Sequence, residues 1–342
     1  MKKIGILQTA FLGDAVLVAA MVDKIHEFYG SDAEIHLILR KNIEPIFEND
    51  PRIASIIAFD KRARDKGVLG MVHVISATRK LGLDVILSVH RSLRSSVIAR
   101  LSGARKVIGF KEAILSSLFS KTVKRNSQEH EVQRNHLLLE ALDDKFKKIQ
   151  PNIKKPYTLY PPETTYRRDL DELEKNTYIV IAPGSKWHTK RWTKDGYINI
   201  ISRIIKNYAY KVILTGDKND IKFSDDIASG VGATKRVMDF AGKLNIPDLF
   251  YLISKARLVI TNDSAPQHIA VGLGVPVVSI FGPTTKKLGY YPYFDKAIVV
   301  EAENVECRPC GLHGHMNCPK KTHRCMDDIL PEDVMEAVIK LL

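Results

Sequence analysis

Short apolar segments alternate with amphipathic segments along almost the whole chain, and this alternation is the strongest constraint on how it folds. In the first half, the apolar segments predict buried strands at residues 4–7, 34–39, 55–59, 85–89 and 106–109. The segments between them have apolar residues at helical spacing and predict helices, among them residues 15–29, 68–81 and 94–101. Because strands that alternate with helices form βαβ units, we predict a parallel sheet with helices on both faces.

A proline-rich segment at residues 150–163 interrupts the alternation and is typical of a linker. The pattern then restarts, with strands predicted at residues 178–182, 211–215, 237–239, 258–261 and 277–281 and helices between them. Because 342 residues exceed one typical core, we predict an α/β protein with two Rossmann-like domains whose parallel sheets face a central cleft. The predicted parts are residues 1–160, residues 161–330 and a C-terminal helix at residues 331–342.

The charge of the chain is strongly basic and unevenly distributed. The net charge is +13, and residues 1–160 carry 27 Lys and Arg against 17 Asp and Glu, an excess of 10. Such a surface attracts nucleic acid, an anionic membrane face or phosphorylated substrates, although an ordinary solvated surface can be equally basic. No apolar stretch reaches the roughly 18 residues of a membrane span, and polar residues interrupt the apolar N-terminus before any cleavage signal. We therefore expect a cytoplasmic protein.

The turn after the first predicted strand holds an acid near the start of a helix. Gly13 permits a tight turn, and Asp14 follows it. One interpretation is an acid stabilised by the helix dipole, and the other is a general base that faces the cleft. The turn has a single glycine in place of the G-x-G-x-x-G of a dinucleotide site, which argues against a nicotinamide-dependent oxidoreductase.

The turn at residues 183–192 combines residue types that suit phosphate binding. Gly184 and Ser185 offer backbone N–H groups and a hydroxyl, while Lys190 and Arg191 offer positive charge. Solvated loop cations are the alternative interpretation, but their position directly after a parallel strand favours an anion site.

The turn at residues 262–268 lies between two apolar strands and concentrates an acid, a hydroxyl, an amide and an imidazole. The N–H groups at the start of the following helix are available to an anion. Alternatively, Asp263 or Ser264 caps that helix and His268 is a buried core histidine. Acids at residues 217 and 220, between the two turns, suit ribose hydroxyls or are exposed loop acids. Together these segments describe a nucleotide diphosphate site.

These motifs resemble those of the bacterial ADP-heptose:lipopolysaccharide heptosyltransferases of glycosyltransferase family 9. The resemblance covers nearly the whole chain and is carried by residues 12–14, 183–185, 189–192, 262–268 and 281–284. It implies a GT-B architecture with an acceptor-binding first domain, a donor-binding second domain and an active site between them. It also implies inversion at the anomeric carbon and no catalytic metal.

The resemblance further implies roles for individual residues. Asp14 is the expected base, and Lys190 contacts the donor phosphates and ribose. Asp220 stands where the family has a glutamate, and Ala265 stands where it usually has a glycine, which leaves less room for a ligand. The expected donor-binding residues are Gly184, Ser185, Lys190, Asp220, Leu244, Asp263, Ser264, Ala265 and His268, with Gln267 completing the turn.

The basic first half gains a role from the same resemblance, since arginine binds phosphate and carboxylate groups bidentately. An acceptor hydroxyl is expected to attack ADP-heptose opposite ADP, while Asp14 takes its proton and Lys190 stabilises the leaving ADP. The expected partners are the nucleotide-sugar donor and a lipopolysaccharide inner-core acceptor, with peripheral association at the cytoplasmic face of the inner membrane and no nucleic acid. The candidate acceptor-binding residues are Gly13, Arg62, Arg91, Arg94 and Lys111, each of which is alternatively part of an ordinary basic surface.

All four cysteines lie close together near the C-terminus, at Cys307, Cys310, Cys318 and Cys325. Four thiolates at this spacing suit a structural zinc or iron ion, and disulfides are not expected in a cytosolic protein. The alternative is four reduced cysteines on a loop.

Three other functions remain open on the sequence. The first is a transferase of the same fold that uses another sugar donor or a protein acceptor such as an autotransporter. The second is a nucleotide-binding oxidoreductase. The third is a nucleic-acid-binding protein, against which stands the absence of a recognisable reader motif.

Overall fold

The computed structural model describes residues 1–60, 67–165 and 167–342. The chain forms two compact units, which are described separately. Unit 1 comprises Met1–Asn152 and Pro156–Tyr160, and unit 2 comprises Ile153–Lys155 and Pro161–Leu342. The division falls within the proline-rich segment.

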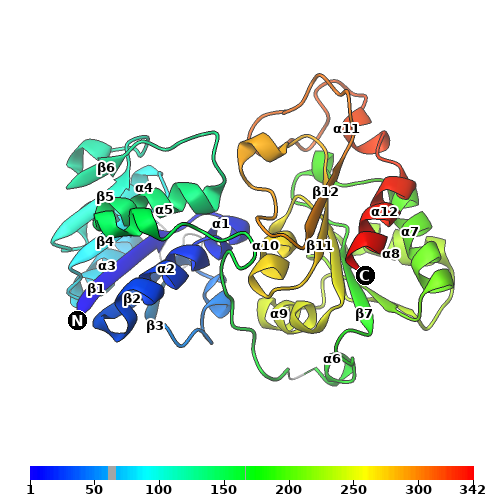
Figure 1. The fold of residues 1–342 in the computed structure, drawn as a ribbon, viewed down its shortest axis with the longest axis horizontal. Coiled ribbons are helices and arrows are strands. Elements are labelled where there is room, and N and C mark those ends of the chain that lie inside the picture. The colour runs from blue at the N-terminus through cyan, green and yellow to red at the C-terminus, as the bar shows by residue number, and fades with distance from the viewer. Residues whose placement is uncertain (61–66, 166) are drawn as a thin grey trace. The chain divides into compact units, whose positions relative to one another are not determined.

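Unit 1 is built on a six-stranded parallel sheet in the order β3-β2-β1-β4-β5-β6 (Figure 1). The central strand β1 has neighbours on both sides, since Ile4 is in register with Ile35 of β2 and with Val85 of β4. Strands in such a position are covered on both faces, which is why they are nearly continuously apolar in sequence. The strands are β1 (Lys2–Gln8), β2 (Ala33–Arg40), β3 (Ile53–Phe59), β4 (Val85–Ser88), β5 (Lys106–Phe110) and β6 (Lys121–Val123).

The helices and strands of unit 1 differ from the predicted ones in two respects. The single helix predicted at residues 15–29 is two helices, α1 and α2, and both β6 and α5 were missed. The pattern of α5 is weak because it buries polar side chains, among them Arg134 and Asn135, on its inner face. The helices are α1 (Leu12–Val16), α2 (Ala19–Tyr29), α3 (Gly67–Lys80), α4 (Leu93–Leu101) and α5 (Glu131–Leu142), with 3₁₀ turns at Gly30–Asp32, Glu44–Ile46, Ser116–Leu118 and Asp144–Lys148.

Unit 2 repeats this topology with a second six-stranded parallel sheet, in the order β12-β11-β10-β7-β8-β9. With its strands renumbered from β7, this is the order of the first sheet, and it is the order of the doubly wound Rossmann fold. The predicted fold class of two Rossmann-like parallel sheets is confirmed. The strands are β7 (Tyr178–Ala182), β8 (Lys211–Leu214), β9 (Val237–Asp239), β10 (Leu258–Asn262), β11 (Val277–Phe281) and β12 (Ala297–Glu301).

Helices cover both faces of the second sheet, with α7, α8 and α12 on one side and α9 and α10 on the other (Figure 1). The hydroxyl of Thr193 accepts a hydrogen bond from Gly196 N at the start of α7, which fixes where this helix begins. The helices are α6 (Arg168–Asp171), α7 (Lys194–Asn207), α8 (Ile221–Val231), α9 (Ile246–Lys255), α10 (Ala265–Gly272), α11 (Arg324–Asp327) and α12 (Pro331–Leu341), with 3₁₀ turns at His188–Lys190 and Lys286–Leu288.

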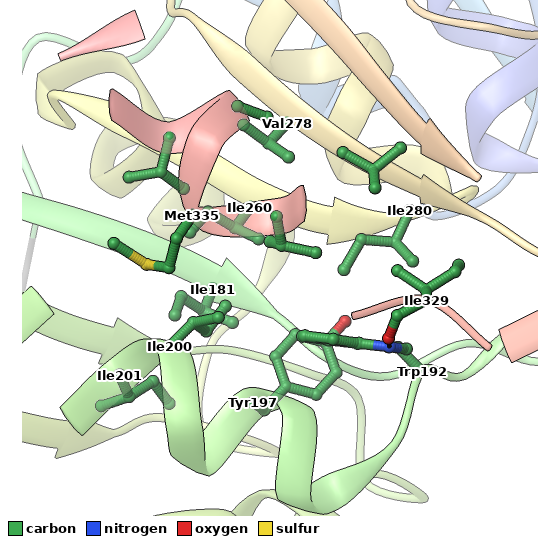
Figure 2. Packing of buried hydrophobic residues seen from close by; sticks show 14 of the residues in the cluster. Ile181, Trp192, Tyr197, Ile200, Ile201, Ile260, Val278, Ile280, Ile329 and Met335 are labelled. Carbon is green, nitrogen blue, oxygen red and sulfur yellow. Dashed lines mark hydrogen bonds between the residues drawn. The ribbon is translucent and has the colours of Figure 1, made fainter. Parts of the chain in front are cut away.

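The core beneath α7 anchors the turn that precedes this helix (Figure 2). Trp192 is 1% exposed, its ring packs edge-on against Tyr197 at 5.1 Å between centroids, and its Nε1 donates to the carbonyl of Ile329 at 3.2 Å. A buried tryptophan with its N–H satisfied holds its position strongly. The residues just before Trp192 are therefore attached to a rigid point.

Among the described residues, no helix combines the length and the apolar composition needed to cross a membrane.

Candidate active site

The polar turns of unit 2 lie at the switch point of its sheet. They follow β7 and β10, which are adjacent parallel strands whose chain continues to opposite sides of the sheet. Open α/β sheets bind ligands outside the carboxyl ends of strands at such a point. The two turns predicted to bind a nucleotide diphosphate are therefore neighbours in the structure.

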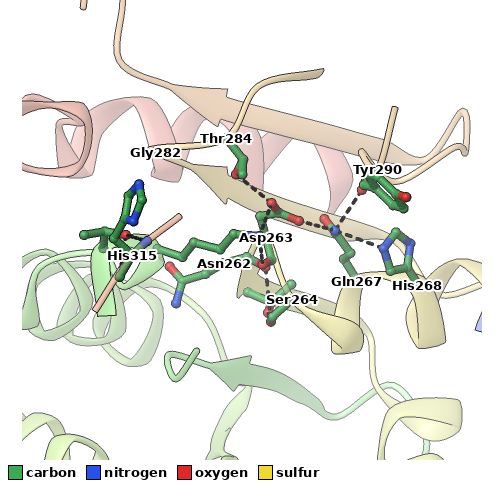
Figure 3. Close-up of polar contacts among 12 residues, drawn as sticks. Asn262, Asp263, Ser264, Gln267, His268, Gly282, Thr284, Tyr290 and His315 are labelled. Atoms are coloured by element: carbon green, nitrogen blue, oxygen red, sulfur yellow. Dashed lines mark hydrogen bonds and ion pairs between the residues drawn. The ribbon is translucent and has the colours of Figure 1, made fainter. Parts of the chain in front are cut away.

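Asp263 is the centre of a buried hydrogen-bonded group at this point (Figure 3). Its Oδ2 lies 2.6 Å from Nζ of Lys190 and accepts a hydrogen bond from the hydroxyl of Thr284, also at 2.6 Å. Its Oδ1 accepts from the side-chain amide of Gln267 at 3.0 Å. Because buried charges need both a partner and further hydrogen bonds, these contacts fix the ammonium group of Lys190 in place.

Asn262 joins the end of β10 to the first turn. Its Nδ2 donates to the carbonyl of Pro183 at 2.7 Å, and its Oδ1 accepts from Trp192 N at 3.1 Å and from the hydroxyl of Tyr197 at 3.0 Å. Asn262 could not be assigned a role of its own from the sequence. Its fully buried amide, with donor and acceptor both satisfied, connects the two turns.

The start of α10 is not capped by the side chain of Ser264. Ser264 is the N-cap residue, but its hydroxyl lies 3.0 Å from that of Thr261 and makes no capping bond. Ala265 is the first residue of the helix. The interpretation of Ser264 as a capping side chain is therefore wrong, and no side chain of the N-cap residue occupies the N–H groups at the start of α10.

His268 is nearly fully buried on α10. Burial lowers its pKa to about 4, and the nearby charge of Asp263 opposes this shift only in part. The imidazole is therefore neutral at pH 7. Its Nε2 lies 3.3 Å from Nε2 of Gln267, so this histidine is part of the packed base of the site.

Asp220 forms an ion pair with Arg191 at 2.8 Å from Oδ1 to Nη2. Arg191 also donates through Nε to the carbonyl of Ser185 at 3.0 Å. Gly184 is required beside this pair, since a Cβ at that position would lie 2.2 Å from the Asp220 carboxylate. Burial raises the pKa of Asp220. Leu244, the residue predicted to contact adenine, lies half-buried between β9 and α9. The contact of Asp220 with the ribose and the contact of Leu244 with adenine both stay predictions.

The expected base of unit 1, Asp14, is the third residue of α1, and its Oδ2 accepts a hydrogen bond from Phe11 N at 3.3 Å. Its pKa is raised to about 6, first by burial and then by the negative charge of Glu131, while Arg125 opposes the shift. Asp14 forms no ion pair with any residue in the described part of the chain. A carboxyl group with this pKa exchanges its proton near neutral pH.

Glu131, at the start of α5, was not identified from the sequence. Its Oε2 accepts a hydrogen bond from Nη1 of Arg134 at 3.0 Å and another from Arg125. Arg134 is 1% exposed and also donates through Nε to the carbonyl of Asn126 at 2.8 Å. The only signal in the sequence was an acid and an arginine three residues apart at a helix start, which is common on exposed helices.

A cluster of hydroxyl groups and an imidazole lies at the switch point of the first sheet, between β1 and β4. The Thr9 hydroxyl lies 2.9 Å from Nδ1 of His90 and 3.0 Å from the hydroxyl of Ser95. The hydroxyl of Ser92 caps α4 by accepting from Ser95 N. These groups are hydrogen-bonding partners on the same edge of the sheet as Asp14.

The candidate acceptor-binding residues divide into three groups. Gly13 lies in α1 beside Asp14. Arg91, Arg94 and Lys111 are exposed in the segments that follow β4 and β5, and Ile114 N donates to the carbonyl of Arg91 at 3.1 Å. Arg62 lies outside the described residues.

The four cysteines are all free thiols. Burial raises the pKa of Cys310, and the neighbouring Cys307 and Cys318 raise it further. Burial raises the pKa of Cys325 to about 12, with a further contribution from Cys310. Within the described ranges, however, no group of three or more His, Cys, Asp or Glu side chains is arranged to hold a metal ion. As arranged here, the thiols do not form a ligand set.

Two doubly wound parallel sheets in one chain, each with polar turns at its switch point, are the architecture of the GT-B class. The sequence model of glycosyltransferase family 9 (heptosyltransferase) matches residues 72–320. The chain belongs to this family and is a glycosyltransferase.

Individual proteins agree with this assignment. Lipopolysaccharide heptosyltransferase 3 of Escherichia coli (strain K12) is 28% identical over 346 residues, which cover 96% of this chain and 95% of that protein. The crystal structure of a family 9 glycosyl transferase from Veillonella parvula matches with a TM-score of 0.82 at 20% identity, over 99% of this chain and 97% of that one. The E. coli ADP-heptose lipopolysaccharide heptosyltransferase II matches with a TM-score of 0.78 at 20% identity, over 100% and 98% of the two chains. At these identities, the two solved structures show the fold alone.

Proposed function

We propose that this chain is an inverting transferase that moves heptose from ADP-heptose to the inner core of lipopolysaccharide. The single observation that carries the proposal is the buried group of Lys190, Asp263 and Thr284 at the switch point of unit 2, within a member of family 9. Its relatives include proteins named as lipopolysaccharide heptosyltransferases. In this proposal residues 161–330 bind the donor and residues 1–160 bind the acceptor.

The proposed donor site uses the two polar turns of unit 2. The ammonium group of Lys190 binds the diphosphate, and the N–H groups at the start of α10 bind it as well. Negative charge accumulates on the diphosphate as the anomeric carbon–oxygen bond breaks, and these donors stabilise that charge without a metal ion. The burial of Lys190 supports this role, because an ammonium group in a site of low dielectric acts more strongly on an anion.

The proposed catalytic base is Asp14. The acceptor hydroxyl oxygen forms the new bond to the anomeric carbon on the face opposite ADP, its proton passes to the Asp14 carboxylate, and ADP leaves with the bonding electron pair. A base must be deprotonated at the working pH and still hold a proton well enough to remove it. A pKa of about 6 supports this role better than the ordinary value of an aspartate does.

The proposed acceptor is anionic, and the basic residues of unit 1 favour it. Arg91, Arg94 and Lys111 are exposed after the carboxyl ends of β4 and β5, on the same edge of the sheet as Asp14. Arginine pairs bidentately with phosphate and carboxylate groups. In this proposal the enzyme works in the cytoplasm, peripherally on the inner membrane that carries its acceptor.

Two measurements test the proposal. Calorimetry with ADP, UDP and GDP is expected to show a clear preference for ADP. Turnover of ADP-heptose is expected with a lipopolysaccharide core acceptor and not with autotransporter peptides. Preference for another base contradicts the proposed donor, and turnover with peptide alone assigns the chain to the protein-acceptor alternative. Reduction of NAD(P)⁺ without sugar transfer would assign it to the oxidoreductases.

A structural zinc or iron ion on the four cysteines stays a prediction, and no step of the reaction depends on it. Elemental analysis of protein purified anaerobically tests it. Zinc or iron at one ion per chain, lost in a variant with Cys310→Ser, supports the prediction, and its absence removes it.

A further inference from the structure

The cysteine-rich segment, defined here as residues 303–323, lies between β12 and α11 and packs directly on the proposed donor site. It holds most of the cysteines but was assigned no part in the reaction. Its contacts are made with two separate turns, the one at residues 188–190 and the one at residues 282–284. The inference below rests on the proposed role of Lys190 in binding the donor.

The first contact is made through Thr189, the residue before Lys190. The hydroxyl of Thr189 donates to the carbonyl of His315 at 2.8 Å and accepts from His315 N at 2.8 Å. The backbone N of Thr189 donates to the same carbonyl at 3.1 Å, and Nε2 of His323 lies 3.1 Å from the Thr189 carbonyl. Thr189 is 4% exposed. One buried residue of the turn is thus held on three of its polar groups.

The second contact is made through Arg308, which reaches the turn after β11. Its guanidinium donates through Nη2 to the carbonyl of Thr284 at 2.9 Å and through Nε to the carbonyl of Gly282. In addition, Cys310 N donates to the carbonyl of Pro283 at 2.8 Å. An arginine that satisfies several carbonyls holds a turn rigidly because its donors form a planar, preorganised group.

Gly314 lies between the two turns. A Cβ at this position would lie 3.0 Å from the Thr189 hydroxyl, 3.1 Å from the ring of Pro283 and 3.4 Å from Cγ of Lys190. Its φ of +77° is also in the left-handed region that favours glycine. The segment therefore approaches both turns closely at a single point.

The two turns converge on one atom. Lys190 and Thr284, one from each turn, both contact Oδ2 of Asp263 at 2.6 Å. The segment makes hydrogen bonds to backbone carbonyls of the turn at residues 282–284 and to Thr189, the neighbour of Lys190. Burial lowers the pKa of His313 in this segment, and the charges of Lys190 and Asp263 also act on it. The hydrogen bonds of the segment therefore bear on the positions of Lys190 and Thr284.

We propose that the cysteine-rich segment is a positioning element of the donor site. It holds Lys190 through its hydrogen bonds to Thr189, and it holds Thr284 through Arg308, so that both residues lie where the nucleotide diphosphate binds. Thr189 is a positioning residue and acts through Lys190. A displacement of about 1 Å in a group that binds phosphate is enough to weaken binding measurably.

The test compares Thr189→Val in two backgrounds by calorimetry with ADP. In the wild-type background, the variant is expected to bind ADP about fivefold more weakly, because it loses the hydroxyl bonds that orient the turn. Thr189→Ser, which keeps the hydroxyl, is expected to bind ADP as the wild type does. In a Lys190→Ala background, Thr189→Val is expected to change ADP affinity less than twofold, since a residue that acts through Lys190 has no further effect once Lys190 is gone. The donor KM rises with the Kd, and the acceptor KM does not change.

The matched control is Thr177→Val. It also removes a threonine hydroxyl, which donates to the carbonyl of Glu174 at 2.7 Å and does not belong to the proposed donor site. Unchanged ADP affinity in Thr189→Val overturns the inference, and so does an equal loss in both backgrounds. If Thr189→Val does not fold, the ADP affinity of Arg308→Lys is compared in the wild-type and Thr284→Val backgrounds. The inference then predicts a loss of affinity in the wild-type background and a smaller loss in the Thr284→Val background. Failure of the proposed function can be distinguished from failure of this inference. If Lys190 does not bind the donor, the single variant Lys190→Ala binds ADP as the wild type does.

Discussion

The switch points of the two sheets occupy the same place in the same strand order, but their charges are arranged differently. In unit 2, the carboxylate of Asp263 is paired with Lys190 at 2.6 Å and held by two further hydrogen bonds. In unit 1, Asp14 receives one long backbone hydrogen bond, and the switch point itself holds the hydrogen-bonded cluster around Thr9 and His90.

In the proposed function, this difference separates a binding site from a proton-transfer site. A paired and hydrogen-bonded carboxylate is a fixed structural group that orients its cation. A half-buried carboxylate without an ion-pair partner can have a raised pKa and exchange a proton near neutral pH, as the value of about 6 for Asp14 indicates. The four predictions below test this division of roles.

The largest effect is expected for Asp14→Asn, which keeps the shape of the side chain and removes its basicity. Turnover is expected to fall by on the order of 10²–10⁴-fold, while the Kd for ADP stays within about twofold. Steady-state kinetics and calorimetry measure the two quantities, with the exposed Asp32→Asn as the control. Near-normal turnover contradicts the assignment of the base, and a large loss of ADP affinity contradicts the separation of the two sites.

The next largest effect is expected for Lys190→Ala. Loss of a charge-assisted hydrogen bond costs about 1.5–3 kcal/mol, which corresponds to about 10- to 100-fold weaker ADP binding and a slower reaction. Lys186→Ala, a change of an exposed lysine in the same turn, serves as the control and is expected to have little effect. If both variants bind ADP equally well, the paired lysine is not the phosphate ligand.

A smaller effect is expected in the pH profile. Asp14 acts only when deprotonated, so kcat/KM is expected to fall as the pH decreases through about 6. Glu131→Gln removes a negative charge that raises the pKa of Asp14, and the acidic limb of the profile is then expected to move to lower pH. Glu140→Gln, on the same helix, is the control. An acidic limb that stays in place, with the fold intact, shows that Glu131 does not act on the base.

The smallest effect is expected for Arg94→Ala, because exposed charges contribute little individually. The acceptor KM is expected to rise about two- to fivefold at low salt, with the difference decreasing as salt is added. The donor KM is expected to stay the same. A change in the donor KM instead of the acceptor KM would mean that Arg94 is not part of the acceptor-binding surface.

Much of the fold was predictable because buried parallel strands are apolar over their whole length. The predicted strands at residues 178–182 and 277–281 coincide with β7 and β11, since both faces of the sheet are covered by helices. β6 was missed because it is a short edge strand with exposed residues. α5 was missed because it buries Arg134, whose partners are Glu131 of the same helix and carbonyls of the preceding loop, so its pattern is not that of an apolar face.

The candidate site was predictable in its residue types but not in its pairings. The turns at residues 183–192 and 262–268 could be identified because several residue types that suit phosphate binding are concentrated directly after apolar strands. That Lys190 pairs with Asp263, and that Asp220 pairs with Arg191, depends on which turns meet in space. The sequence has no internal repeat, yet the same strand order occurs in both sheets. This is possible because many different apolar sequences can form the same buried strands.

The sequence alone determined the two parallel α/β halves, the linker between them and the strand ends that carry the polar turns, because apolar periodicity and turn chemistry are local properties of the chain. The tertiary structure decided which charges are paired, how the cysteine-rich segment holds the turn of Lys190, and why Asp14 has a raised pKa. These depend on burial and on the distance between residues remote in sequence, and electrostatic energies change steeply with both.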